Sequence, residues 1–223
     1  MTIENGIKNL DKVITKIEFA RLQKSDHHIV QLVAISKYST SADIKALYQA
    51  GQRAFGENKV QDLKKKMEEL EELPISWHFV GTLQKNKINN LIDLNPTLMH
   101  SLDSLDLAEE LNKKLQAKEK TMNCLLQINS AYEESKSGVD PKDAVSIYEK
   151  IQKEYPNINL KGVMSIGAHS DDTKLIEDSF VTTKEIFDQI DGDICSMGMS
   201  SDFELAIKNG SNMIRVGSAL FKE

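Results

Sequence analysis

Short apolar runs and stretches of helical apolar spacing alternate along the whole chain. The first run, 29–35, is interrupted only by Gln31. Runs that are nearly continuous in this way are typical of strands buried on both faces. We predict strands over 29–35, 53–55, 75–80, 97–102, 122–129, 160–166, 193–197 and 212–216.

The stretches between the apolar runs predict helices. An amphipathic helix opens the chain, with apolar side chains at helical spacing at Ile7, Leu10, Ile14 and Ile17. Thr40 with Asp43 forms a capping-box pattern, Gly51 stands where that helix would end, and Gly210 ends a later helix in the same way. Further helical patterns cover 60–70, 83–92, 104–118, 141–153, 173–190, 202–209 and 217–221.

Strand and helix units that repeat in series predict an α/β fold with parallel strands. The most economical closure is a single (β/α)8 TIM-type barrel with an additional N-terminal helix, so that 1–223 forms one domain. A doubly wound open sheet is the competing architecture. It usually has fewer strands, and no GxGxxG segment follows the first predicted strand.

The composition is that of a globular protein. Of 223 residues, 40% are hydrophobic, and 28 Lys and Arg against 34 Asp and Glu give a net charge of −6. This mild acidity favours no nucleic acid partner, and no segment has the length and apolarity of a signal peptide or a membrane span. Cys124 and Cys195 lack CxxC spacing, which favours a reducing compartment, so we expect a cytoplasmic protein. The lysine run 64–66 precedes Glu68 and Glu69, a pattern typical of a solvated helix face.

Residues just past the carboxyl ends of barrel strands share one mouth, where barrel active sites lie. Lys37 follows the first predicted strand. An amine placed over a low-dielectric core loses its proton more easily, and the neutral form attacks carbonyl carbons. The alternative is a lysine whose stem covers apolar surface while its amine reaches solvent.

Two later strand ends have features of an anion site. The segment 196–202 (SMGMSSD) runs through a Gly/Ser turn into a helix start, and 215–218 (RVGS) adds a cation, a glycine and a hydroxyl. Phosphate sites in barrels commonly occupy the loops after strands seven and eight. Each loop alone is equally typical of an ordinary turn. Together, with an amine opposite, they suggest a phosphorylated carbonyl ligand.

Other reactive side chains have simpler structural interpretations. His78 lies within a predicted strand, where a hydrogen-bonded structural histidine is the first interpretation and a general base the second. Cys195 is interpreted as a small buried side chain. The histidines and cysteines show no metal-ligand spacing, so we expect no metal site.

Specific motifs cover nearly the whole chain in order. They are VAISK (33–37), FGEN (55–58), HFVGTLQKNK (78–87), HSLDS (100–104), QIN (127–129), SKSG (135–138), GVM (162–164), SMGMSSDF (196–203) and RVGS (215–218). Two of them, HFVGTLQKNK and SMGMSSDF, are highly specific. On these motifs the sequence resembles the pyridoxal phosphate homeostasis proteins, whose barrel is similar to the N-terminal domain of alanine racemase.

The resemblance implies that the cofactor is pyridoxal 5'-phosphate (PLP), held as a Schiff base on Lys37. It also implies that Ser200, Gly217 and Ser218 bind the phosphate of this cofactor.

The remaining residues implied by the resemblance surround the pyridine ring. Arg215 would face the ring nitrogen, and Asn58 would line the pocket, with His78 ranked below them. Because a cation cannot favour protonation of that nitrogen, the ring would be a weaker electron sink than one paired with an aspartate.

We therefore expect a PLP-binding protein of intracellular PLP homeostasis, a carrier or regulator without established catalytic turnover. Its partners would be PLP and PLP-dependent apoenzymes, and the chain would be monomeric. One alternative is an active PLP-dependent amino-acid racemase. A less favoured one is a Schiff-base lyase or isomerase that acts on a phosphorylated sugar. The predicted barrel uses almost the whole chain. Because almost no residues remain for a second domain, the length favours the carrier over the racemase.

Overall fold

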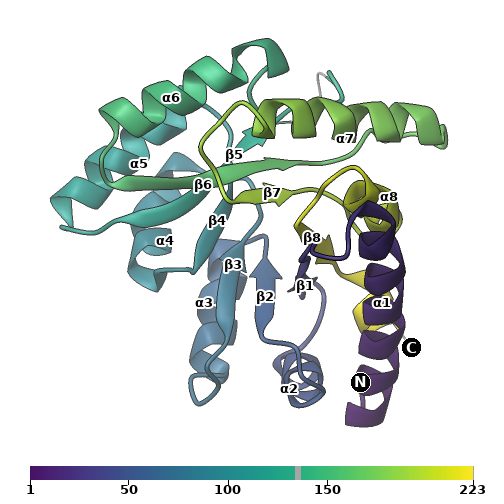
Figure 1. Cartoon of the computed structure of the whole chain (residues 1–223). Helices are drawn as coiled ribbons and strands as arrows, with labels where there is room; N and C mark the ends of the chain where they lie inside the picture. Colours follow the sequence, from purple (N-terminus) through teal and green to yellow (C-terminus); the bar gives the residue numbers. More distant parts are fainter. Residues whose placement is uncertain (134–136, 223) are drawn as a thin grey trace.

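Parallel strands form a closed barrel in the computed structural model, which describes residues 1–133 and 137–222 (Figure 1). Each strand pairs with the next, and β8 closes the barrel by pairing with β1. The strands are β1 (Gln31–Ile35), β2 (Ala54–Glu57), β3 (Ser76–Phe79), β4 (Leu98–Leu102), β5 (Met122–Ile128), β6 (Ile158–Ser165), β7 (Ile194–Ser196) and β8 (Met213–Val216).

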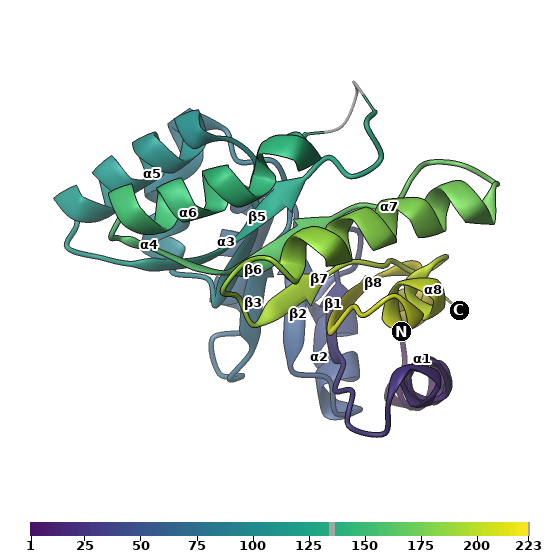
Figure 2. The same cartoon turned by 45° about the horizontal axis from the view of Figure 1, so that its top comes forward.

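Helices between the strands form the outer layer, as the turned view shows (Figure 2). The helices, including α1 before the first strand and α9 after the last, are α1 (Ile3–Lys24), α2 (Ser41–Gln49), α3 (Val60–Glu69), α4 (Ile88–Leu94), α5 (Leu105–Ala117), α6 (Ala144–Glu154), α7 (Thr173–Phe187), α8 (Phe203–Lys208) and α9 (Ser218–Phe221), with 3₁₀ turns η1 (Lys85–Lys87) and η2 (Pro141–Asp143). The predicted (β/α)8 TIM-type barrel with an additional N-terminal helix is confirmed. Element ends differ from the predicted ones by a few residues, since apolar runs continue past the last ladder hydrogen bonds.

Local signals at helix ends are confirmed. Thr40 and Asp43 form a reciprocal capping box at the start of α2. Gly51, past the end of α2, has φ +120°, and Gly210, past α8, has φ +98°. Both glycines occupy the left-handed region that side chains with a Cβ rarely enter, which explains why these helices stop there.

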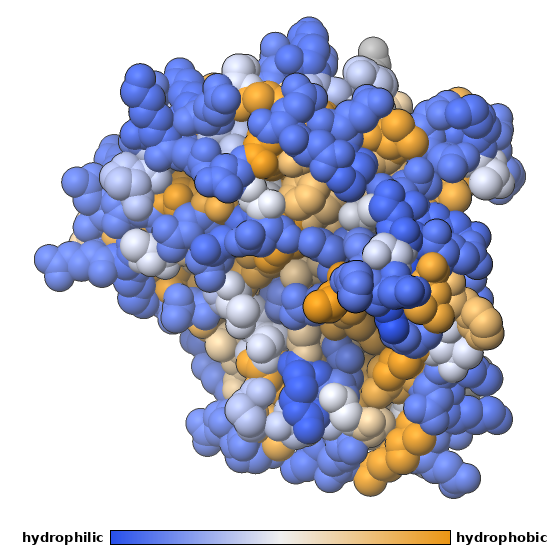
Figure 3. Space-filling model, viewed as in Figure 1, coloured by the Kyte–Doolittle hydropathy of each residue, from blue (hydrophilic) through white to orange (hydrophobic). Residues whose placement is uncertain are grey.

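The opening helix α1 packs outside the barrel, against α2, α8 and α9. Leu10 and Ile17 are buried as expected, but Ile7 and Ile14 are 45% and 44% exposed. The buried stripe turns instead through Val13, because a helix that packs on one side can bury only one face. Apolar surface therefore gathers over α1 at the lower right of the space-filling view (Figure 3).

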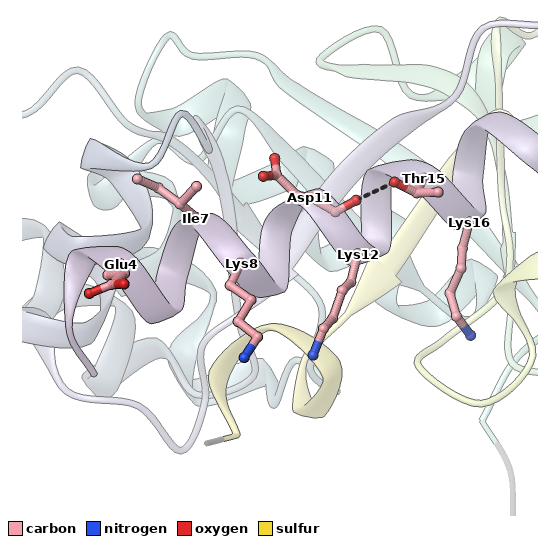
Figure 4. A pocket seen from close by; sticks show the side chains of 7 residues that line it. All are labelled: Glu4, Ile7, Lys8, Asp11, Lys12, Thr15 and Lys16. Atoms are coloured by element: carbon pink, nitrogen blue, oxygen red, sulfur yellow. Dashed lines mark hydrogen bonds between the residues drawn. The ribbon is translucent and has the colours of Figure 1, made fainter.

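A shallow hollow of about 730 Å³ runs along the outer face of α1 (Figure 4). Its lining comes from one helix: Glu4, Ile7, Lys8, Asp11, Lys12, Thr15 and Lys16. The Thr15 hydroxyl donates a hydrogen bond to the carbonyl of Asp11 within the helix, at 2.8 Å. None of the side chains with predicted chemistry lies here.

The barrel interior changes character along its axis. Its apolar layer consists of Val33, Ala54, Leu98, Leu125, Met164 and Met213. Nearer the carboxyl ends of the strands, the inward positions carry His78, His100, Ser196 and Arg215, all buried. This polar layer leads to the mouth of the barrel, where the loops with candidate chemistry begin.

Part of the lysine run 64–66 does not lie on a solvated face. Lys64 and Lys65 are exposed and face Glu68 and Glu69 along α3, as predicted. The prediction is wrong for Lys66, which is 8% exposed and forms an ion pair with Glu57. A charge pattern along the helix cannot show that the third lysine turns toward the strands.

Candidate functional site

Barrel closure brings the most widely separated predicted residues together. Strand β1 lies between β8 and β2, with Val33 opposite Arg215 and Ile35 opposite Gly56. The loop with Lys37 therefore stands between the loop after β8 and the loop after β2. The predicted amine, phosphate loop and pocket residue thus share one side of the mouth.

Lys37 occupies a tight turn beyond the end of β1. The backbone N–H of Ser39 donates to the carbonyl of Ser36 at 2.8 Å, so Lys37 and Tyr38 form the corner of the turn. Both side chains are exposed, and Lys37 Nζ lies 5.0 Å from the centroid of the Tyr38 ring. The exposure matches the second interpretation of this lysine, in which its amine reaches solvent, since β1 ends at Ile35, two residues before it.

The loops after β7 and β8 meet through a hydrogen bond between predicted phosphate ligands. The N–H of Gly217 donates to Ser200 Oγ at 3.1 Å, and Ser218 follows directly at the start of α9. A Cβ on Gly217 would lie 3.1 Å from the carbonyl oxygen of Ile35. The glycine thus lets this loop approach β1 closely, and backbone N–H and hydroxyl donors gather where an anion could be held.

Arg215 lies inside the barrel and not on the rim. Its Nη1 donates to Ser196 Oγ at 2.7 Å and its Nη2 donates to the carbonyl of Ser165 at 2.8 Å. The residue is 5% exposed, and burial lowers the pKa of its guanidinium to about 10, against the opposing influence of Asp202. Arg215 therefore remains a cation at neutral pH, and its hydrogen bonds are to neutral oxygens.

A pair of histidines continues this network across the barrel. His78 Nδ1 lies 2.8 Å from His100 Nε2, and His100 Nδ1 lies 3.3 Å from Ser196 Oγ. Burial lowers the pKa of His78 to about 4 and that of His100 well below its usual value, so both rings are neutral.

The donors in this network can be ordered from Arg215 outward. Ser196 Oγ accepts from Arg215, so we assign the Ser196 hydroxyl as a donor to His100 Nδ1. His100 Nε2 then carries the proton of that ring and donates it to His78 Nδ1. His78 Nε2 is then a buried donor, and it has no partner among the described residues. His78 is hydrogen-bonded, as the structural interpretation of this residue expects, but it also retains one free polar atom.

Asn58 follows β2 and lies half-buried at the mouth. A Cβ on Gly81 would overlap its carbonyl oxygen at 1.9 Å, so the loop after β3 packs directly on its backbone. Farther round the mouth, a cavity of about 230 Å³ is lined by Val80, Thr82, Gln127, Ile128, Asn129, Ser137 and Ile166. It contains none of the predicted site residues.

Ser135 and Lys136 of the SKSG motif lie outside the described residues. Within 1–133 and 137–222, no three His, Cys, Asp or Glu side chains gather as a metal-binding group. In the same ranges no helix combines the length and apolarity that a bilayer crossing requires.

His100, Ser196 and Ser165 acquire a role only in the structure. The sequence places all of them at strand ends but assigns them no partner. The signal available was parity, since His100 is two residues after the inward Leu98 and Ser196 is two after Ile194, which packs against the same apolar layer. Parity shows which side chains point inward, but it does not show which ones meet.

Comparisons with known proteins show the family to which this chain belongs. The family described as alanine racemase, N-terminal domain, matches residues 18–223. A pyridoxal phosphate homeostasis protein from Helicobacter pylori (strain ATCC 700392 / 26695) is 56% identical over 217 residues, which cover 97% of this chain and 98% of the relative. The chain belongs to the pyridoxal phosphate homeostasis protein family.

Solved structures of other proteins have a similar fold. PipY of Synechococcus elongatus PCC7942 with PLP bound has 32% identity and a TM-score of 0.79, over 92% of this chain and 99% of that chain. An alanine racemase from Clostridium difficile 630 has 14% identity and a TM-score of 0.79, with this whole chain covering 60% of that one. The racemase likeness concerns the fold alone.

Proposed function

We propose that this chain binds PLP as a Schiff base on Lys37 and acts in intracellular PLP homeostasis. The observation that carries the proposal is the meeting of three features beside β1: the exposed Lys37 turn, the Gly217–Ser200 contact and the buried Arg215 cation. Membership of the family and the PLP-bound structure of PipY support it.

The residues present fit the cofactor group by group. Ser200, Gly217 and Ser218 would bind the phosphate, since they offer hydroxyl and N–H donors and Gly217 lets the backbone come close. Asn58 would line the pocket from β2. His78 would contribute its unpartnered Nε2, which a ligand could satisfy.

Arg215 would face the ring nitrogen and set what the bound cofactor can do. PLP supplies an electron sink, whose strength depends on protonation of the ring nitrogen. A guanidinium held by Ser196 and Ser165 is a hydrogen-bond donor and a positive charge, so it opposes that protonation. This favours storage of the cofactor over broad amino-acid chemistry.

Exposure of Lys37 suits a carrier. Condensation of its neutral amine with the aldehyde forms one C=N bond and releases one water, and hydrolysis reverses both steps. Because the side chain is open to solvent, water or another amine could reach the C=N carbon and release the cofactor. We propose PLP-dependent apoenzymes as recipients and a monomer as the working form. The two buried free thiols accord with a reducing compartment, the cytoplasm.

The test is spectroscopic and chemical. The purified protein incubated with PLP should turn yellow, and borohydride should bleach the colour and fix the cofactor mass on Lys37. Lys37→Ala should remain unlabelled, while Lys59→Ala, an exposed lysine at the start of α3, should label like the wild type. A protein that stays colourless, or label on lysines other than Lys37, would contradict the proposal.

The racemase alternative predicts a different result with the same sample. Single-enantiomer amino acids in deuterated water should gain deuterium at the α-carbon if the chain is a racemase. We expect no sustained exchange. Multiple turnovers per chain would replace the carrier proposal with an enzymatic one.

A further inference from the structure

Lys66 and Glu57 form a buried ion pair beneath the turn that carries Lys37. Glu57, the last residue of β2, is 0% exposed, and Lys66 reaches it from α3 with Nζ 2.6 Å from Oε1. Removal of two charges from water costs about as much as their attraction returns, so such a pair is a poor device for stability alone. Its place beside the proposed site suggests another role.

Both members of the pair bond to Ser36, the residue before Lys37. Lys66 Nζ donates to the Ser36 carbonyl at 2.7 Å, and Ser36 Oγ donates to Glu57 Oε1 at 2.6 Å. The Ser36 N–H donates to the carbonyl of Gly56 at 3.0 Å. Every polar group of Ser36 is therefore held by β2 or α3, and the backbone from which Lys37 departs is fixed.

The ion pair lies on the opposite face of β2 from the barrel interior. A Cβ on Gly56 would meet the inward side chain of Ile35 at 2.7 Å, so Glu57, the next residue, points outward to α3. Glu57 Oε2 is buried and has no partner among the described residues. Ser36 Oγ and Lys66 Nζ therefore both donate to the other oxygen, Oε1. Lys66 Nζ also donates to the Ser36 carbonyl.

We infer that Lys66 and Glu57 are positioning residues that hold Ser36 so that the Lys37 amine stands where an aldehyde group reaches it. This inference rests on the proposed function, because it concerns the C=N bond to Lys37. Phosphate and ring contacts come from the loops after β7 and β8. Loss of the ion pair should therefore weaken covalent capture and spare non-covalent binding.

The double variant Glu57→Met/Lys66→Met tests the inference without leaving an unpaired charge. PLP reports on covalent capture, through the absorption that borohydride removes, and pyridoxamine 5'-phosphate reports on ring and phosphate binding because it has no aldehyde. We expect the equilibrium constant for the Schiff base to fall about tenfold, the scale of one lost charge-assisted hydrogen bond. Affinity for pyridoxamine 5'-phosphate should change by less than about twofold.

Lys65→Met is the matched control, since Lys65 is exposed on the same helix and faces Glu69 at 3.8 Å. It should leave both probes unchanged. Equal losses for the two probes, no loss for either, or a double variant that fails to fold by circular dichroism would each overturn the inference. A wild-type protein that forms no reducible adduct would instead overturn the proposed function and the inference with it.

Discussion

Two buried cations lie beside β1, Arg215 inside the barrel and Lys66 outside it, and their hydrogen bonds go to different kinds of acceptor. Arg215 sits inside the barrel beside β1, where neutral oxygens of Ser165 and Ser196 accept its hydrogen bonds. Lys66 sits outside the barrel, between β2 and α3, where the carboxylate of Glu57 faces it. The first cation thus bonds to neutral oxygens, with the charge of Asp202 also acting on it, whereas the second bonds directly to a carboxylate.

The difference separates what each cation can do. A cation bonded to neutral groups creates a positive potential in a low-dielectric interior, and a ligand atom entering there feels it. A cation already paired with a carboxylate has little field left and acts through its geometry. Arg215 is therefore suited to contact a ligand, and Lys66 to hold the backbone.

We expect the largest effect when Lys66, the cation paired with a carboxylate, is removed alone. Lys66→Met leaves the Glu57 carboxylate buried without a counter-charge, so we expect a loss of about 3–5 kcal/mol in the free energy of unfolding. Denaturant unfolding of the cofactor-free protein measures it. Adding Glu57→Met should restore most of the loss, whereas Lys65→Met should stay within about 0.5 kcal/mol of the wild type. An equally stable Lys66→Met protein would mean that the pair is not coupled.

Removal of Arg215, whose hydrogen bonds go to neutral oxygens, should destabilise the protein less. Arg215→Met loses two hydrogen bonds but leaves only neutral acceptors and relieves the burial of a charge, so we expect a cost of about 1–2 kcal/mol. Arg215→Glu should shift the absorption spectrum of bound PLP, because a carboxylate favours protonation of the ring nitrogen. A spectrum identical to that of the wild type would remove the proposed contact with the ring.

The neutral histidines that extend the Arg215 network have the smallest expected effect at neutral pH, and their effect grows only on acidification. His78 has its pKa lowered from 6.5 to about 4, so the unfolded chain binds a proton that the folded chain rejects between these values. Stability is therefore fully present above pH 6.5 and falls as the pH drops toward 4, by at most about 1.4 kcal/mol per pH unit for each such histidine. Denaturant unfolding at several pH values should show this slope.

A variant comparison isolates the histidine contribution. His78→Asn should flatten the dependence between pH 6.5 and 4, while His27→Asn, at an exposed position, should keep it. An unchanged slope in His78→Asn would show that folding does not lower the pKa of this ring.

Much of the barrel could be predicted from local signals. The apolar runs locate all the strands of the closed barrel, and Thr40, Gly51 and Gly210 mark helix ends through capping and left-handed backbone. These signals are local, so they survive without knowledge of the fold. The exposed Ile7 and Ile14 show the limit, since a periodic apolar pattern does not state how wide the partner surface is.

Some residues of the candidate site could be predicted from sequence, and others could not. Lys37, Ser200 and Gly217 stand out by residue type and by position after strands, but their roles toward PLP remain predictions. The burial of Lys66 and the chain from His78 through His100 and Ser196 to Arg215 have no counterpart in sequence spacing. Residues separated by most of the barrel meet there only because the sheet closes.

The sequence by itself determined the order of strands and helices, the family and the residues with candidate chemistry, because periodicity, capping and motifs are written in neighbouring positions. The tertiary structure decided which cations are buried and what faces each of them. Burial and pairing depend on distances across the barrel, and these distances set both the cost of a charge and its remaining field. That is why two cations of the same sign, Arg215 and Lys66, have different proposed roles.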